Sequence, residues 1–335
     1  MKKLLVITIS FVLFAIVLTS CSFTTPTNST ETVDAQTPTA QQVTTINIGD
    51  YVQLGKYNDE PILWRCVDID ENGPLMLADK ILTIKAFDVK GKHTYIDGSA
   101  QVDIDNYRTN YGSNLWETSN MRSWLNSTAT AGKVTWLDGC PPSKDKVKFN
   151  SYANEKGFIA EGNFTINEQN IIKSVTQKSL LNSIDVVKLS LGGTEIHKFD
   201  DSYITTAVQN YDTAYYHNVV DKVFLLDVKQ IAKIHLNRNT LGIDYFIGKP
   251  TQKAVDISEY KNSELSPKNG WQCFIRSPFT ESNDPIGVRG INVVGIVISY
   301  AASNDGIGVR PAFYINLTSL IFKVGNGSAT APYTL

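Results

Sequence analysis

The chain lacks the residue patterns that usually mark catalytic and metal sites. It holds four cysteines in 335 residues, with no Cys-x-x-Cys pair, and its four histidines do not cluster at metal-ligating spacing. There is no Gly-x-Ser-x-Gly elbow, and no Ser-x-x-Lys stands in a catalytic context. The 31 basic side chains are nearly matched by 33 acidic ones, so the basic excess of nucleic-acid-binding proteins is missing. We therefore expect no metal, no cofactor and no nucleic-acid partner.

The N-terminus carries an apolar run behind two positive charges. Lys2 and Lys3 precede the uncharged residues 4–18, an order that is typical of an export signal. Cys21 follows Leu18 at the spacing of a bacterial lipobox. This resemblance implies cleavage before Cys21, a diacylglycerol thioether on its sulfur, and an extracytoplasmic protein anchored to the bacterial membrane.

Two other interpretations of the N-terminus remain open. A spanning helix would need about 20 apolar residues, which is more than this run offers. An ordinary cleaved signal would need a small-x-small site, and none stands out near residue 20. The lipidated Cys21 is the prediction that we adopt.

The segment behind the signal is rich in threonine and poor in large apolar residues. Nine of residues 22–45 are Thr, a composition that cannot bury enough apolar surface to offset the entropy of ordering. We expect a signal peptide (1–20), a Thr-rich disordered tether (21–45) and a folded domain (46–335). The length of that domain leaves open whether it divides in two near residue 150.

The remaining cysteines are Cys66, Cys140 and Cys273. In an exported protein an odd number leaves at least one free thiol or an intermolecular bond. Cys66 and Cys273 lie in apolar strand-like runs, which favours buried structural thiols. The state of each of the three stays open.

Strand patterns begin the domain. Residues 46–52, 62–67 and 75–77 predict a β-meander, with a turn at 71–73. Residues 68–73 also match the first half of a calcium loop. The flanks are strand-like rather than helical, so we expect a hairpin turn.

Strand patterns also end the domain. Residues 271–276 predict one strand, and residues 288–298 predict two short strands around Gly295. Residues 307–315 predict the closing strand, in which Pro311 indicates an edge position or a bulge.

The middle of the chain predicts helices. Thr118 or Ser119 caps a short helix over 120–126, and a second helix is expected over 167–181. Residues 222–226 predict a buried strand. Asp227 then caps a helix whose apolar side chains are Ile231, Ile234 and Leu236. The expected fold class is therefore α+β.

Several of these segments resemble the bacterial domain family of unknown function DUF6273. They follow the order of the family between residue 47 and about residue 318. The segments are Gly49–Val52 with Gly55–Tyr57, Ile62–Arg65, Trp116–Asn126, Asp221–Asp227, Ile275–Pro278 and Gly308–Ala312.

The resemblance implies a compact α+β domain. More distantly, it implies the C-type-lectin-like fold of formylglycine-generating enzymes, in which the first and last strands pair and long loops carry ligand. One departure is visible, because Val293-Val294-Gly295 stands where similar sequences often have Ser-Asp-Gly. The family itself implies no established activity.

Arg276 and Arg310 are the most distinctive polar residues of the strands. A guanidinium in an apolar strand must find acceptors, because a buried unpaired charge is costly. One interpretation is that these arginines clamp carbonyls or carboxylates inside the loop region. The other is that they bind an acidic or sugar ligand together with Trp271, Arg289 and Asn304.

The aromatic residues allow two interpretations as well. The 15 Tyr, 14 Phe and 5 Trp either fill a β-rich core, or some of them line a binding groove. The same alternative applies to one local cluster, where rings pack in the core or stack on a sugar. That cluster consists of Tyr211, Tyr215, Tyr216 and His217.

These observations favour a non-catalytic lipoprotein whose domain binds a glycan or peptide of the cell envelope or extracellular medium. The alternative is an enzyme on a formylglycine-generating scaffold that uses Cys273 or Cys140. That chemistry would need a reactive cysteine pair late in the chain, where Cys273 stands alone. A third hypothesis is a scaffold for other envelope proteins.

Overall fold

The computed structural model describes residues 45–91, 102–182, 185, 216–279, 284–319, 322 and 324–335. The expected signal peptide, Cys21, the tether up to residue 44, Tyr211 and Tyr215 lie outside the described residues. Within the described ranges, no helix has both the length and the apolar character needed to cross a membrane.

The first sheet is an antiparallel sheet of five strands in the order β1-β2-β3-β12-β5. It opens with the predicted three-stranded meander, but the first strand spans residues 51–57 rather than the expected 46–52. The β1–β2 hairpin turns at Asn58 and Asp59, both at positive φ, as a two-residue type I′ loop requires. The strands are β1 (Tyr51–Tyr57), β2 (Glu60–Asp70), β3 (Gly73–Ala78), β12 (Ala312–Ile315) and β5 (Ile172–Lys173).

The second sheet has the order β10-β9-β8-β11-β4, and only its β8–β11 pair is parallel. The expected strand at 271–276 is confirmed as β8 (Cys273–Pro278). The expected pair around Gly295 is confirmed as β9 (Gly287–Ile291) and β10 (Val297–Ala301). The short strands β4 (Thr83–Ile84) and β11 (Gly308–Val309) complete this sheet.

The predicted closing strand changes sheets. β11 belongs to the second sheet and β12 to the first, and Arg310 and Pro311 lie between them. Proline has no amide hydrogen to donate to a ladder, so the strand breaks at this residue. The chain from β3 to β4 makes the same crossing alongside it, with Ala78 N donating to Pro311 O at 2.9 Å and Leu82 N to Val309 O at 3.0 Å.

The predicted helix over 167–181 is wrong beyond its first turns. α3 (Ile166–Ile171) begins at a Thr165–Glu168 capping box, but β5 and β6 (Val175–Leu180) follow it. Burial in β6 alternates, with Val175, Gln177 and Ser179 buried. The period is two because β6 pairs along its whole length with β7 (Tyr216–Asp221), and this long-range pairing overrides the local helical pattern.

Two predicted helix starts are confirmed. Ser119 caps α2 (Asn120–Leu125), and Asp227 caps α5 (Val228–Leu236) in a capping box with Gln230. Leu236, expected in the apolar stripe of α5, is 70% exposed instead. The other helical elements are α1 (Val102–Tyr111), η1 (Trp116–Thr118), α6 (Arg238–Leu241), α7 (Gln252–Ile257) and η3 (Leu317–Ser319).

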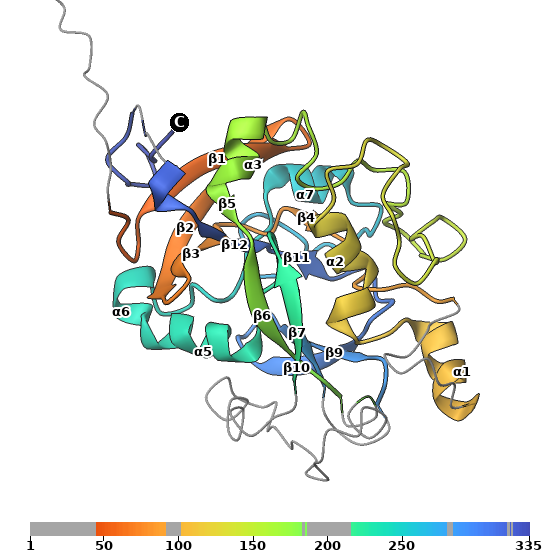
Figure 1. The fold of residues 1–335 in the computed structure, drawn as a ribbon. Coiled ribbons are helices and arrows are strands. Elements are labelled where there is room, and N and C mark those ends of the chain that lie inside the picture. The colour runs from red at the N-terminus through yellow and green to blue at the C-terminus, as the bar shows by residue number, and fades with distance from the viewer. Residues whose placement is uncertain are drawn as a thin grey trace, which may run out of the picture. The chain divides into compact units, whose positions relative to one another are not determined.

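The expected strand at 222–226 is wrong as an element. Residues 223–226 are buried as predicted, but they form an extended connection with a single bridge between Phe224 and Ala312. The β6–β7 pair that precedes this connection lies between α2 and α5 (Figure 1).

One cluster of buried apolar side chains extends through both five-stranded sheets. The largest fully buried rings include Trp64, Trp116, Trp124 and Phe274, so core packing accounts for these aromatics. The described fold is α+β, with mostly antiparallel sheets and a few short helices.

The ends of the described domain meet at β1. The β12 strand pairs with β3 and β5 rather than with β1. The C-terminal segment reaches β1 instead, since Tyr51 N donates to Gly327 O at 2.8 Å and Gln53 N donates to Tyr333 O at 2.9 Å. This segment therefore covers the free edge of the first sheet.

Candidate functional site

A pocket of about 430 Å³ opens where the β2–β3 turn, the β6–β7 pair and α5 meet. Small-molecule sites in proteins enclose about 300–1,000 Å³, so the pocket is of ligand size. Fourteen of the described residues line it, and each of these is charged, otherwise polar or a tyrosine. Such a lining recognises a ligand through hydrogen bonds and charge rather than through apolar burial.

Arg276 forms part of the base of this pocket from β8. Its Nη1 donates to Leu225 O and to Gln230 Oε1, both at 2.7 Å, and its Nη2 donates to Asp227 Oδ2 at 2.8 Å. Asp227 and Gln230 also form the capping box of α5. The first turn of α5 and the base of the pocket are thus one network, and Arg276 makes the clamp that its sequence context predicts.

Tyr314 extends this network toward the β2–β3 turn. Its hydroxyl donates to Asp70 Oδ2 at 2.6 Å and accepts from Gln230 Nε2 at 3.4 Å. Burial, and secondarily the bond to Asp70, raises the pKa of the Tyr314 phenol well above its ordinary value. The phenol therefore keeps its proton and acts as a donor. Polar contacts run from Arg276 through Gln230 and Tyr314 to Asp70, which fixes these side chains before any ligand arrives.

Two buried donors at the pocket have no acceptor among the described residues. They are Gln177 Nε2 and Arg276 Nε, on side chains that are 7% and 3% exposed. A buried donor without a partner costs about 1–3 kcal/mol. Native structures hold few such groups, and a water or a ligand atom can satisfy one.

The rim of the pocket carries charge of both signs. Lys178 Nζ lies 5.0 Å from the ring centroid of Tyr216, and Lys233 Nζ lies 2.8 Å from Asp68 Oδ2. The hydrogen bond to Asp68 raises the pKa of Lys233, which stays protonated. Four cationic and three anionic side chains line the pocket, a net charge of +1 on a chain whose net charge is −2.

Arg276 is the predicted site residue that lines this pocket. Trp271 is buried, and its Nε1 donates to Gly306 O at 3.0 Å. Arg289 is fully buried, with its Nε donating to Pro278 O at 3.1 Å, and burial lowers its pKa to about 9. Asn304 lies in an exposed turn, where its Oδ1 accepts from Gly306 N at 3.0 Å.

Arg310 is a second clamp. Its Nε, Nη1 and Nη2 donate to Ala78 O, Tyr245 O and Asp79 O at 2.8, 2.9 and 3.0 Å. Its guanidinium also lies 4.5 Å from the ring centroid of Tyr245. The predicted ligand-binding role of Arg310 stays a prediction, as it does for Trp271, Arg289 and Asn304. The contacts of Arg276 and Arg310 match the interpretation in which these arginines hold carbonyls or carboxylates in place.

Sequence reasoning did not single out most of the pocket. Asp70 stood in the calcium-like run, and Gln177 stood inside the incorrectly predicted helix. The described residues contain no group of three or more His, Cys, Asp or Glu side chains placed to hold a metal ion. The signal that could have revealed Gln177 is the alternation of β6, which turns a glutamine toward the interior.

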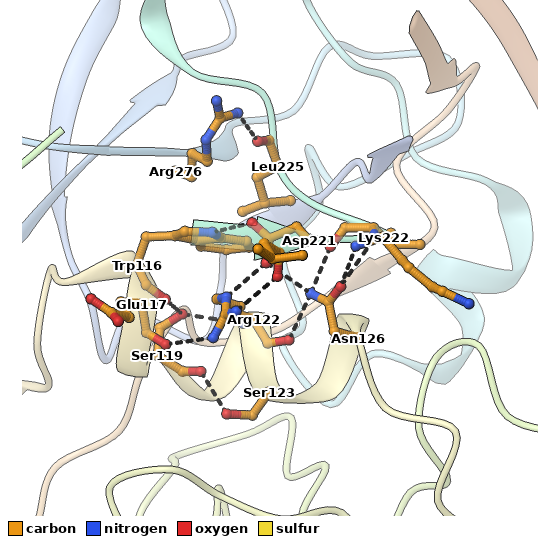
Figure 2. A network of polar contacts seen from close by, with 12 residues as sticks. Trp116, Glu117, Ser119, Arg122, Ser123, Asn126, Asp221, Lys222, Leu225 and Arg276 are labelled. Atoms are coloured by element: carbon orange, nitrogen blue, oxygen red, sulfur yellow. Dashed lines mark hydrogen bonds and ion pairs between the residues drawn. The ribbon is translucent and has the colours of Figure 1, made fainter. Parts of the chain in front are cut away.

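A separate network joins α2 to β7 and the segment after it (Figure 2). Asp221 accepts from Trp116 Nε1 at 2.9 Å and from Arg122 Nε at 2.7 Å. Asn126 accepts from Lys222 N at 2.7 Å and donates to Val223 O at 2.8 Å. The segments Trp116–Asn126 and Asp221–Asp227 thus hold each other in place, which gives their characteristic residues a structural role.

The three cysteines that the structure describes are buried. Cys66 and Cys273 carry free thiols, and Cys140 is buried as well. Burial raises the pKa of the Cys66 thiol to about 12, and burial also raises that of Cys273. The nucleophile is the thiolate, so Cys66 and Cys273 are poor nucleophiles at neutral pH.

The fold and the site define an α+β protein with a preorganised, ligand-sized polar pocket. The chain belongs to DUF6273, a domain family of unknown function, whose sequence model matches residues 72–317. This confirms the resemblance in the sequence. The match includes the Asp221 network and every pocket residue except Asp70 and Glu71, whereas residues 49–65 lie outside it. No curated protein and no solved structure matches this chain.

Proposed function

We propose that the protein is an exported, membrane-anchored lipoprotein whose folded domain binds a polar ligand without transforming it. The ligand is a glycan or peptide of the cell envelope or the extracellular medium. The observation that carries this proposal is the polar pocket, whose base is held by the contacts of Arg276, Gln230 and Tyr314 and contains two donors without acceptors.

The anchor rests on the lipobox that ends at Cys21, behind a charged and apolar signal. A diacylglycerol cysteine holds a protein at the membrane through more than one chain, since a single chain binds only marginally. Labelled fatty acid supplied to producing cells is expected to enter the full chain and not a Cys21→Ala variant. Equal labelling of both would refute the anchor.

A C-type-lectin-like architecture is part of the proposal. Two features support it: the mostly antiparallel sheets, and the C-terminal segment that bonds to β1. In this proposal the β2–β3 turn and the β6–β7 pair present the ligand site. The enzyme alternative gains no support, because burial raises the pKa of the Cys273 thiol.

Thr176→Trp tests the pocket as the binding site. Thr176 lines the pocket with an exposed side chain, so a tryptophan there fills the pocket without displacing core atoms. We expect binding of the detergent-solubilised full chain to arrayed glycans and envelope peptides to fall at least about tenfold, with unchanged thermal unfolding.

Ser174→Trp is the matched control, since Ser174 is exposed two residues earlier and does not line the pocket. It is expected to bind as the natural sequence does. If both variants retain full binding, the pocket is not the site.

A further inference from the structure

The chemistry of the unsatisfied donors narrows the class of ligand. Arg276 Nε can only donate a hydrogen bond, and Gln177 Nε2 is a donor as well, so the partner that each lacks among the described residues is an acceptor. Their strands, β8 and β6, pack against each other, and both side chains line the pocket. A ligand oxygen with free lone pairs is the complementary group.

The charge of the lining favours a negatively charged oxygen. The net charge of the pocket is +1, and Lys178 at its rim is exposed. Lys178 Nζ lies over the Tyr216 ring, and none of the described carboxylates forms an ion pair with it. An ammonium and a guanidinium in one pocket attract a carboxylate, and the attraction weakens as salt is added.

The rest of the lining favours a sugar over an acidic peptide. Asp70, Glu71 and Asp227 line the same pocket, where they can accept hydrogen bonds from hydroxyl groups but would repel a run of carboxylates. The lining residues that the structure describes include no aliphatic side chain to receive an apolar residue of a peptide. The ring of Tyr216 is half-buried, and aromatic rings stack on sugar faces.

We infer that the pocket binds an acidic saccharide, a sugar that carries one carboxylate among its hydroxyls. This inference rests on the proposed binding function. The carboxylate meets Lys178 at the rim, and the hydroxyls donate to the carboxylates of Asp70 and Glu71. The buried donors of Gln177 and Arg276 bond to a further ligand oxygen or to a water that the ligand holds in place.

The test compares pairs of ligands that differ by one carboxylate. The detergent-solubilised full chain is applied to an array of glucuronate- and galacturonate-containing oligosaccharides, with their glucose and galactose counterparts. Poly-glutamate serves as the acidic peptide. The tightest acidic saccharide and its neutral counterpart are then titrated by calorimetry. We expect the acidic member to bind at least about tenfold more tightly, with a preference that shrinks as salt is added.

Two variants, each with a matched control, separate a binding role from a structural one. Gln177→Leu removes an unsatisfied buried donor, so it is expected to raise the unfolding temperature while weakening acidic-saccharide binding about tenfold. Ser179→Ala removes a second unsatisfied group on the same face of β6, outside the pocket lining, and should leave binding unchanged. Lys178→Gln is expected to weaken binding of the acidic saccharide several-fold, whereas Lys133→Gln, at an exposed site outside the pocket, should not.

The outcomes distinguish this inference from the proposed function. If acidic and neutral saccharides bind with equal affinity and Thr176→Trp abolishes the binding of both, the preference for an acidic saccharide is refuted. The proposed binding function is then still supported. Poly-glutamate bound more tightly than any saccharide would overturn the inference in favour of an acidic peptide. If no saccharide and no peptide binds, both the inference and the proposed function fail.

Discussion

Asp221→Ala is expected to lower the free energy of unfolding by about 3 kcal/mol, because it breaks a buried ion pair by removing one partner. Asp221 is 1% exposed and accepts from Arg122 Nε and Trp116 Nε1 (Figure 2). Its loss leaves the indole donor of Trp116 without this acceptor and the Arg122 guanidinium without its counter-charge. Urea denaturation of the full chain in detergent measures the change.

Asp244→Ala is the matched control for this prediction. Asp244 is exposed, so the same substitution there should leave stability nearly unchanged. Asp221→Asn keeps an oxygen acceptor but removes the charge, and an intermediate loss is expected. If Asp221→Ala is as stable as Asp244→Ala, the network does not hold α2 to β7.

Arg310→Ala is expected to cost about 3 kcal/mol or more of unfolding free energy. The arginine is 5% exposed and satisfies three backbone carbonyls, two at the start of the β3–β4 connection that crosses between the sheets and one at Tyr245. Its loss leaves those carbonyls without this donor, which costs about 1–3 kcal/mol for each one that stays dry. It also removes the cation from the ring of Tyr245.

Arg310→Lys tests the geometry of this clamp. A lysine keeps the charge but has no planar fork, so it cannot reproduce three divergent bonds, and a loss of about half that of alanine is expected. Arg238→Ala serves as the surface control, because Arg238 is exposed and its Nη1 donates to the nearby His235 O. Equal denaturation midpoints for Arg310→Ala and Arg238→Ala would contradict the clamp.

The features that the sequence predicted correctly have local causes. Ser119 caps α2 and Asp227 caps α5 with partners that lie three residues away. The β-meander follows from alternation and from turns at residues 58–59 and 71–72. Such signals lie within one stretch of chain, so a single sequence reveals them.

The features that the sequence predicted incorrectly depend on residues that are far away in the chain. β6 reads as the end of a helix until β7, about forty residues later, pairs with it. Pro311 predicted an edge position or a bulge, whereas β11 and β12 each lie between two neighbouring strands and the proline marks the change from one sheet to the other. The local sequence pattern left the type of element open, and pairing with strands from distant parts of the chain determined it.

Arg276 is the pocket residue that could be predicted from the sequence for a chemical reason. Arg276 stood out because a guanidinium in an apolar strand requires acceptors, and the structure supplies Asp227 and Gln230. Gln177, Gln230 and Tyr314 are ordinary residue types in separate elements, and their convergence is a property of the fold. Family membership does not identify the site either, because the family is defined without a function.

The most direct test of the account is the position of a bound ligand. A crystal structure of the full chain with the tightest-binding saccharide should place it between the β2–β3 turn, β6 and α5, with an oxygen within hydrogen-bonding distance of Gln177 or Arg276. A saccharide bound outside this pocket, for example at the exposed turn of Asn304, would contradict the account.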